Sequence, residues 1–259
     1  MLAAGVLALV WMGQSGGAVT LPVPVYTAAR PGMFPAAWNQ REISPIASSL
    51  EPEEVTRSFN IIDRAMEKYP DSLLKRNLKR VYIVRRLSFY GVPYGGTNSS
   101  DTIYLANAGR EMGFSDRFLE ESFHHEFSSI LLRNYPSLFD RKAWLMANPP
   151  GFKYQGDGTM AVRSGSASTK ANPRLQIDGF MAQYATASIE EDFNMIAEAL
   201  LTGSSDFWRA VQSSPRLRQK ADVAIRFYSS LSGSFNESSF RSLVELQLSE
   251  TARETRTRN

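Results

Sequence analysis

The sequence predicts an α+β fold, with a small sheet in the first half and a mostly helical second half. Residues 80–84 and 101–106 are rich in β-branched and aromatic residues, which is typical of strands. From residue 115 onward, apolar residues recur at helical spacing between polar breaks. With 259 residues, 43% of them hydrophobic, the chain is long enough to bury one sizeable core.

The N-terminus predicts a signal peptide over residues 1–18. Residues 2–12 are an apolar run that is too short to span a membrane comfortably, and small residues precede a cleavage point after Ala18. No Lys or Arg precedes the run, so a buried N-terminal helix or strand is the alternative. On the signal-peptide interpretation, the protein is exported to the periplasm or the extracellular space, and the mature chain has no stable membrane span.

The remaining chain divides into three predicted parts. Residues 19–50 contain five prolines with little periodicity, which predicts an extended lead-in. Residues 51–250 form a single domain, and residues 251–259 form a charged tail. The first elements of the domain are a helix over residues 51–69, with Pro52 in its first turn, and a short helix over residues 71–78.

A glycine-rich loop joins the two predicted strands, and a helix begins after Ser115 and ends near Asn134. Residues 163–172 have the composition of a mobile loop. Ser188 starts a helix that stops at Gly203, and Ser205 or Asp206 caps the next one. Further helices are predicted at residues 141–147, 214–231 and 235–248.

Composition excludes several classes of site. The chain has no cysteine, so disulfides, thiolate metal sites and cysteine nucleophiles are absent. The net charge is +3 and the charges are well mixed, so the sequence gives no reason to expect a nucleic-acid partner.

The helix predicted over residues 115–134 contains both histidines of the chain, His124 and His125, followed by Glu126. In a His-Glu-x-x-His helix, the two histidines lie one turn apart and bind one zinc ion, while the glutamate acts as general base. Here His125 and Glu126 supply the first half of that pattern, and Ser129 stands in place of the second histidine. Taken alone, the pattern is also that of a histidine buried in a core.

Residues 123–131 and 179–193, taken together, resemble the zinc-binding metallopeptidases common in Bacteroidetes, which are similar to the anthrax lethal factor catalytic domain. The resemblance covers roughly residues 50–205 and implies a zincin-like, gluzincin-type fold. It also implies that the protein uses Zn²⁺ to hydrolyse a protein or peptide substrate. It implies that His125 and Glu191 are zinc ligands and that Glu126 is the catalytic base. It also implies that Tyr184 stabilises the oxyanion. Two positions depart from the family pattern, Ser129 at the second histidine and Met195 at a supporting acid.

Several alternatives remain open at these positions. Glu121 lies at i−4 from His125, so it could serve as a ligand, or Ser129 could hold a water that completes the coordination. Glu191 follows Ser188 by three residues, which is also a capping box. Tyr184 fits a core aromatic with a satisfied hydroxyl. The alternative function is a catalytically inactive homologue that acts as a binding module.

Overall fold

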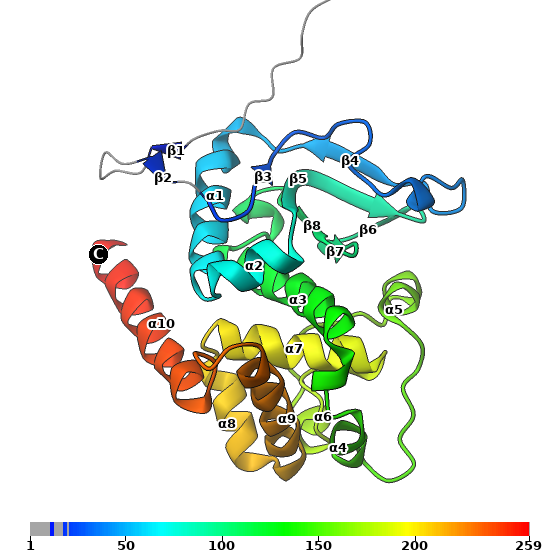
Figure 1. Ribbon diagram of the computed structural model, residues 1–259, viewed down its shortest axis with the longest axis vertical. Coiled ribbons are helices and arrows are strands. Elements are labelled where there is room, and N and C mark those ends of the chain that lie inside the picture. The colour runs from blue at the N-terminus through cyan, green and yellow to red at the C-terminus, as the bar shows by residue number, and fades with distance from the viewer. Residues whose placement is uncertain (1–10, 13–17, 20, 259) are drawn as a thin grey trace, which may run out of the picture. The chain divides into compact units, whose positions relative to one another are not determined.

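The structure, a computed structural model, describes residues 11–12, 18–19 and 21–258 (Figure 1). The chain forms two compact units, Met1–Leu119 and Glu120–Asn259. The single domain expected over residues 51–250 therefore stays a prediction, and each unit is described by itself. Most of the expected signal peptide lies outside the described residues.

Unit 1 is built around the long strand β5 (Arg80–Phe89). β5 pairs in parallel with β3 (Val25–Tyr26) and β8 (Thr102–Ala106), and β8 pairs with the antiparallel edge strand β7 (Gly96–Asn98). The remaining elements of this unit are β1 (Trp11–Met12), β2 (Ala18–Val19), β4 (Ile46–Ser49), β6 (Val92–Pro93), α1 (Pro52–Glu67), α2 (Asp71–Asn77) and two 3-10 helices (Ala36–Trp38, Arg110–Met112). Both predicted strands and both predicted helices of this half are present.

The predicted strand over residues 80–84 was too short, because β5 continues to Phe89. Arg85 and Arg86 interrupt the apolar pattern and are exposed, which hid the second half of the strand. That half pairs with β4 and β6, so sheet partners rather than local composition extend the strand. Tyr82 of β5 and Tyr104 of β8 are paired across the sheet, and their rings are stacked with the centres 5.5 Å apart.

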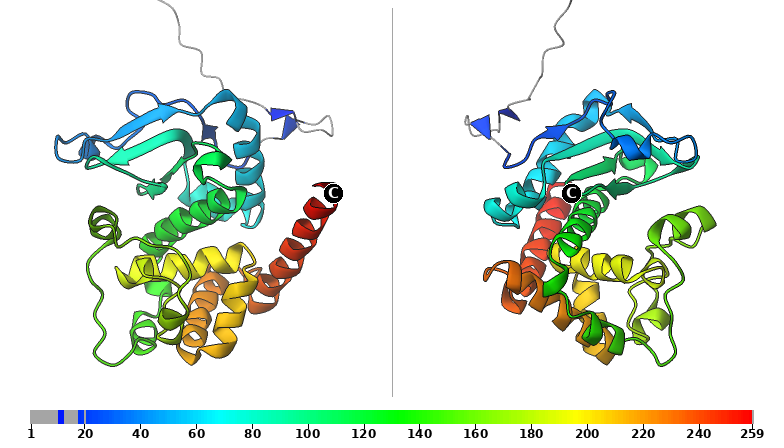
Figure 2. Two further views of the ribbon diagram at one scale, coloured as in Figure 1. Left: turned by 180° about the vertical axis from the view of Figure 1, so that it is seen from behind. Right: turned by 45° about the vertical axis from the view of Figure 1, so that its right-hand side comes forward.

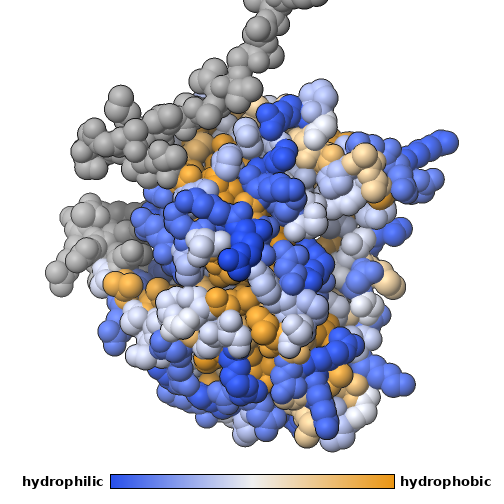
Figure 3. All heavy atoms as spheres, viewed as in Figure 1, coloured by the Kyte–Doolittle hydropathy of each residue, from blue (hydrophilic) through white to orange (hydrophobic). Residues whose placement is uncertain are grey.

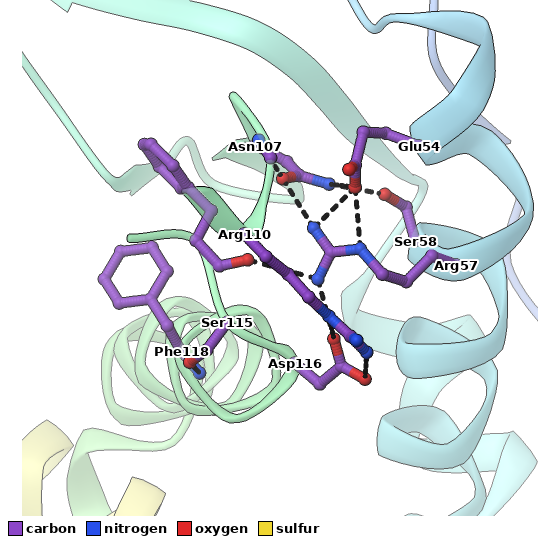
Figure 4. Close-up of polar contacts among 10 residues, drawn as sticks. Glu54, Arg57, Ser58, Asn107, Arg110, Ser115, Asp116 and Phe118 are labelled. Carbon is purple, nitrogen blue, oxygen red and sulfur yellow. Dashed lines mark hydrogen bonds and ion pairs between the residues drawn. The ribbon is translucent and has the colours of Figure 1, made fainter. Parts of the chain in front are cut away.

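A guanidinium joins three elements of unit 1 (Figure 4). Arg57 on α1 donates to Glu54 at 2.6 Å, to Asn107 after β8 at 2.9 Å and to Asp116 at the start of α3 at 2.7 Å. Arg110 also donates to Asp116, at 2.6 Å. Burial raises the pKa of Asp116, but Arg110 and Arg57 more than offset this, so its pKa lies below the ordinary value.

The helix α3 (Asp116–Asn134) contains the boundary between the units, since Leu119 ends unit 1 and Glu120 begins unit 2. Unit 2 is otherwise helical, as predicted. It contains α4 (Arg141–Met146), α5 (Gly158–Ser164), α6 (Pro173–Ile177), α7 (Ile189–Leu201), α8 (Ser205–Ser213), α9 (Pro215–Leu231), α10 (Glu237–Arg258) and two 3-10 helices (Pro136–Leu138, Tyr184–Thr186).

α7 is the centre of unit 2, and it contacts α8, α9 and α10. Phe193 in its second turn is fully buried and lies edge-on to Phe227 of α9, with the ring centres 5.2 Å apart. The two views in Figure 2 show α8 and α9 packed beneath α7, while α5 lies outside these helices near the N-terminal end of α7. Because α7 packs against several helices, its side chains are held in fixed positions.

Three predictions for unit 2 need correction. Ser204, not Ser205 or Asp206, caps α8, because its hydroxyl accepts from the Phe207 N–H. α10 continues to Arg258, beyond the predicted end at residue 248. The predicted mobile loop begins inside α5, which starts at Gly158 because Asp157 caps it and accepts from the Met160 N–H at 2.7 Å.

Hydrophilic and hydrophobic residues are mixed on the face of the molecule that Figure 3 shows. None of the helices that the structure describes has both the length and the apolar character needed to cross a bilayer.

Acid is expected to weaken the link between α9 and α10. Arg218 on α9 makes two hydrogen bonds to Glu237 on α10, at 2.9 and 2.7 Å. Arg218 lowers the pKa of Glu237 from 4.5 to about 2, so the pair stabilises the fold fully above pH 4.5 and loses its effect as the pH falls toward about 2. Urea titrations of wild type and Glu237→Gln should therefore differ at pH 6 and converge near pH 2. The control Glu245→Gln, an exposed carboxylate on the same helix, should not show this pattern.

Candidate active site

α3 places His124 and His125 in a well-packed helix. Phe123, Phe127 and Ile130 are completely buried, so the helix is fixed in rotation about its axis. Ser115 precedes it as predicted, and its hydroxyl accepts from the Phe118 N–H at 3.1 Å.

α7 carries the partners of His125. Ser188 caps this helix and accepts from the Glu191 N–H at 3.1 Å, so the backbone half of the predicted capping box is present. The Glu191 carboxylate contacts His125, at 2.8 Å between Oε2 and Nε2. Glu191 therefore belongs to the cap through its backbone and to the histidine site through its side chain.

His125 lies between two carboxylates. Its Nε2 contacts Glu191, and its Nδ1 lies 2.9 Å from Oε2 of Glu198, two turns further along α7. Burial alone would lower the pKa of His125, but hydrogen bonds to Glu191 and Glu198 more than offset this and raise it well above 6.5. In this form the imidazolium donates one N–H to each carboxylate.

Tyr184 covers one face of that imidazole. The two rings are stacked, with their centres 5.9 Å apart and their planes 13° from parallel. Tyr184 starts the 3-10 helix Tyr184–Thr186, which leads directly into Ser188 and α7. The structure thus brings His125 of α3 together with Tyr184 and Glu191, which lie seven residues apart in a second segment of the sequence.

Ser129, at the position of the missing histidine, is hydrogen-bonded within the protein. Its hydroxyl accepts from Nδ2 of Asn194 on α7 at 2.6 Å, and its residue is 3% exposed. The neighbouring Ser128 donates to Oδ1 of the same amide at 2.6 Å. Asn194 therefore binds both serines and leaves Ser129 oriented toward α7.

The other predicted residues lie on α3. Glu126 is 8% exposed, while Glu121 is partly exposed one turn before His125. His124 is fully buried, and its Nε2 lies 3.8 Å from Glu120. Glu191 and Glu198 contact the two ring nitrogens of His125, and the expected role of Glu121 as a metal ligand stays a prediction.

Two site residues were missed from the sequence, Asn194 and Glu198. Both lie on the same face of α7 as Glu191, at i+3 and i+7, and this spacing could have identified them. Met195, which stands at the position of a supporting acid in the family pattern, is a buried core residue with 4% exposure.

A second buried polar cluster lies beside the first. Asp192 Oδ2 accepts from Lys220 Nζ at 2.6 Å, from Tyr154 at 2.6 Å and from Trp144 at 3.1 Å. The Lys220 ammonium also lies 3.7 Å from the ring centre of Phe180. Burial lowers the pKa of Lys220 and raises that of Asp192, because each charge has left water. This cluster fixes the first turn of α7, which carries Glu191.

Whether a zinc ion fits this site depends on how many ligand atoms point toward one position. His125 Nε2 and Glu191 Oε2 fit two positions of a zinc site, and a carboxylate on the other ring nitrogen, here Glu198, is the usual support of a histidine ligand. Zinc in catalytic sites normally has three protein ligands. Within the described part of the chain, no group of three His, Cys, Asp or Glu side chains has the arrangement of a metal site.

A comparison with solved structures identifies a protein with a similar fold. The chain is similar to the crystal structure of a "putative zinc-binding metallo-peptidase" from Bacteroides caccae, with a TM-score of 0.58. The match covers 90% of this chain and 88% of the other, at 14% sequence identity. The two share a fold. No protein-family model matches the sequence, and no curated protein matches it either.

Proposed function

We propose that this protein is a zinc-dependent peptidase whose metal is held by His125 and Glu191. The observation that carries the proposal is the arrangement Glu191–His125–Glu198, in which one ring nitrogen faces a second potential ligand and the other is held by a carboxylate. The shared fold supports the same assignment. The gluzincin-like ancestry and the zincin-like arrangement belong to this proposal.

Each residue of the site has a role in the proposed reaction. Bound zinc would polarise the scissile carbonyl and make water more acidic. Glu126, next to His125 on α3, accepts the proton of the attacking water. Tyr184 donates a hydrogen bond to the oxygen that gains charge. Metal binding would require His125 to lose its Nε2 proton, and Glu198 would then keep the remaining proton on Nδ1 and hold the ring in place.

The substrate class in this proposal is a protein or peptide, and the location is outside the cytoplasm, periplasmic or extracellular. The location rests on the apolar residues 2–12 and the small residues before position 19.

A second function, a peptide-binding module without catalysis, rests on one specific observation. Ser129 occupies the place of an imidazole ligand and is hydrogen-bonded to Asn194, so two converging protein ligands remain. On this alternative the site binds polypeptide and does not hydrolyse it.

Zinc titration of metal-free protein, purified without a metal-affinity tag, tests the proposal. We expect one zinc ion per chain, no zinc binding in His125→Ala or Glu191→Ala, and an affinity lower by about 10–100-fold in Glu198→Gln. Calorimetry measures all three, with circular dichroism to show that the variants are folded.

The matched control is Glu190→Gln. Glu190 neighbours Glu191 but pairs with Arg133 at the surface, so this variant should bind zinc like wild type. Folded wild-type protein that takes up no zinc would refute the peptidase and leave the binding module.

A further inference from the structure

Residues 155–168, which we call the strap, run alongside the segment that carries Tyr184. The Gln155 and Gly156 N–H groups donate to the carbonyls of Thr186 and Ala187, at 3.2 and 2.9 Å. At the other end of the strap, the carbonyl of Ser168 accepts from the Tyr184 N–H at 3.0 Å. Backbone hydrogen bonds therefore anchor the strap at both ends to the segment that precedes α7.

Between these anchors, Gly158 lies directly against the candidate site. A Cβ atom built at this position would be 2.0 Å from Oε1 of Glu191 and 2.7 Å from the hydroxyl of Tyr184. Real Cβ atoms essentially never come this close to another heavy atom, so a side chain at position 158 would displace either the strap or the ends of the Glu191 and Tyr184 side chains. The strap thus covers one carboxylate oxygen of Glu191 while His125 contacts the other.

The low exposure of the site residues is consistent with a strap that covers them. The side chains of His125 and Glu191 are each 13% exposed, although both are polar and belong to a site that must admit a ligand. Between its two anchors the strap buries little side-chain surface, because Ala161 is the one buried residue in α5. A segment that buries little apolar surface opens locally at a small free-energy cost.

We propose that the strap is a lid over Glu191 and Tyr184, so that a metal ion or peptide reaches the His125–Glu191 pair only after the strap moves away. The ligand classes in this inference rest on the proposed function, but the lid itself does not. Gly158 is a positioning residue, which sets how closely the lid seats on the carboxylate.

Residue-resolved amide hydrogen exchange on metal-free Gly158→Ala tests the lid. The added methyl group should unseat the strap and accelerate exchange at Gly156 and Tyr184 at least tenfold, while Phe193 and Ile196 inside α7 keep their wild-type rates. Gly233→Ala is the matched control, because a Cβ at Gly233 meets no atom within 4 Å. Adding Glu191→Ala removes the carboxylate that the methyl group would meet, so in that background Gly158→Ala should have a smaller effect.

Unchanged exchange at Gly156 and Tyr184 would overturn the proposal, and so would equal acceleration throughout α7. Access is measured separately, as the rate of zinc association with Gly156→Pro, which removes the N–H bonded to Ala187 without touching Glu191. We expect zinc to associate about tenfold faster than with wild type. The control is Ala171→Pro, which places a proline at an exposed position three residues after the strap and should not change the rate. An unchanged rate would overturn the lid, whereas a wild type that binds no zinc refutes the proposed function alone, and hydrogen exchange still decides on the lid.

Discussion

Replacing Lys220 with methionine is expected to lower the free energy of unfolding by about 3–5 kcal/mol, because it leaves a buried carboxylate without its cation. Lys220 and Asp192 are both completely buried, and their side chains are 2.6 Å apart. The remaining partners of Asp192, Tyr154 and Trp144, are neutral donors and cannot replace the lost charge. Urea denaturation followed by circular dichroism measures the change.

Two further variants make the measurement specific. Lys75→Met removes an exposed ion pair to Asp71, 2.9 Å long, and should cost less than about 1 kcal/mol. Combining Lys220→Met with Asp192→Asn removes both buried charges and should recover much of the lost stability. If Lys220→Met destabilised no more than Lys75→Met, the buried pair would not be what holds the first turn of α7.

Ser129→His, made together with Asn194→Ala, is expected to raise zinc affinity by about 100-fold or more, since it adds a third protein ligand one turn after His125. The second substitution is needed because the Asn194 amide lies 2.6 Å from the Ser129 hydroxyl and stands where the imidazole must fit. Zinc titration by calorimetry, with a peptide-cleavage assay, measures the outcome.

The single variants separate the two effects. Asn194→Ala alone should not increase affinity, and Ser129→His alone should gain less than the pair, because the amide still crowds the ring. If the double variant binds zinc and cleaves peptide while wild type does neither, the natural protein is the binding module. If the folded double variant binds zinc no better than wild type, His125 and position 129 do not face one ion.

Much of the fold could be predicted from local sequence patterns. The helices around Phe59, His125 and Phe193 have clear apolar periodicity and recognisable first turns, and they are present close to the expected limits. The second half of β5 could not be predicted, because Arg85 and Arg86 interrupt the apolar pattern and this half of the strand is stabilised by pairing with β4 and β6. α5 was not predicted, because it begins and ends beside glycines and its start depends on a single cap at Asp157.

The candidate site was predictable where one helix motif contained it. His125 and Glu126 are adjacent, and Glu191 follows a serine cap, so both segments could be recognised. The spacing along α7 places Asn194 and Glu198 on the same face as Glu191, but their partners could not be predicted, since these are 65 and 73 residues away in sequence and the contacts require the packing of α3 on α7. The role of Gly158 could not be predicted either, because it depends on how closely the strap approaches Glu191 and Tyr184 in the folded chain.

The boundary inside α3 limits how this protein can be divided for engineering. A cut between Leu119 and Glu120 would separate the capping residue Ser115 and the anchored Asp116 from the fifteen residues of the helix that follow. Each fragment would then carry a new helix end with up to four unsatisfied backbone groups. Fusion partners, split reporters or transplanted halves should therefore be joined at the loops on either side of α3, and its nineteen residues should be kept as one piece.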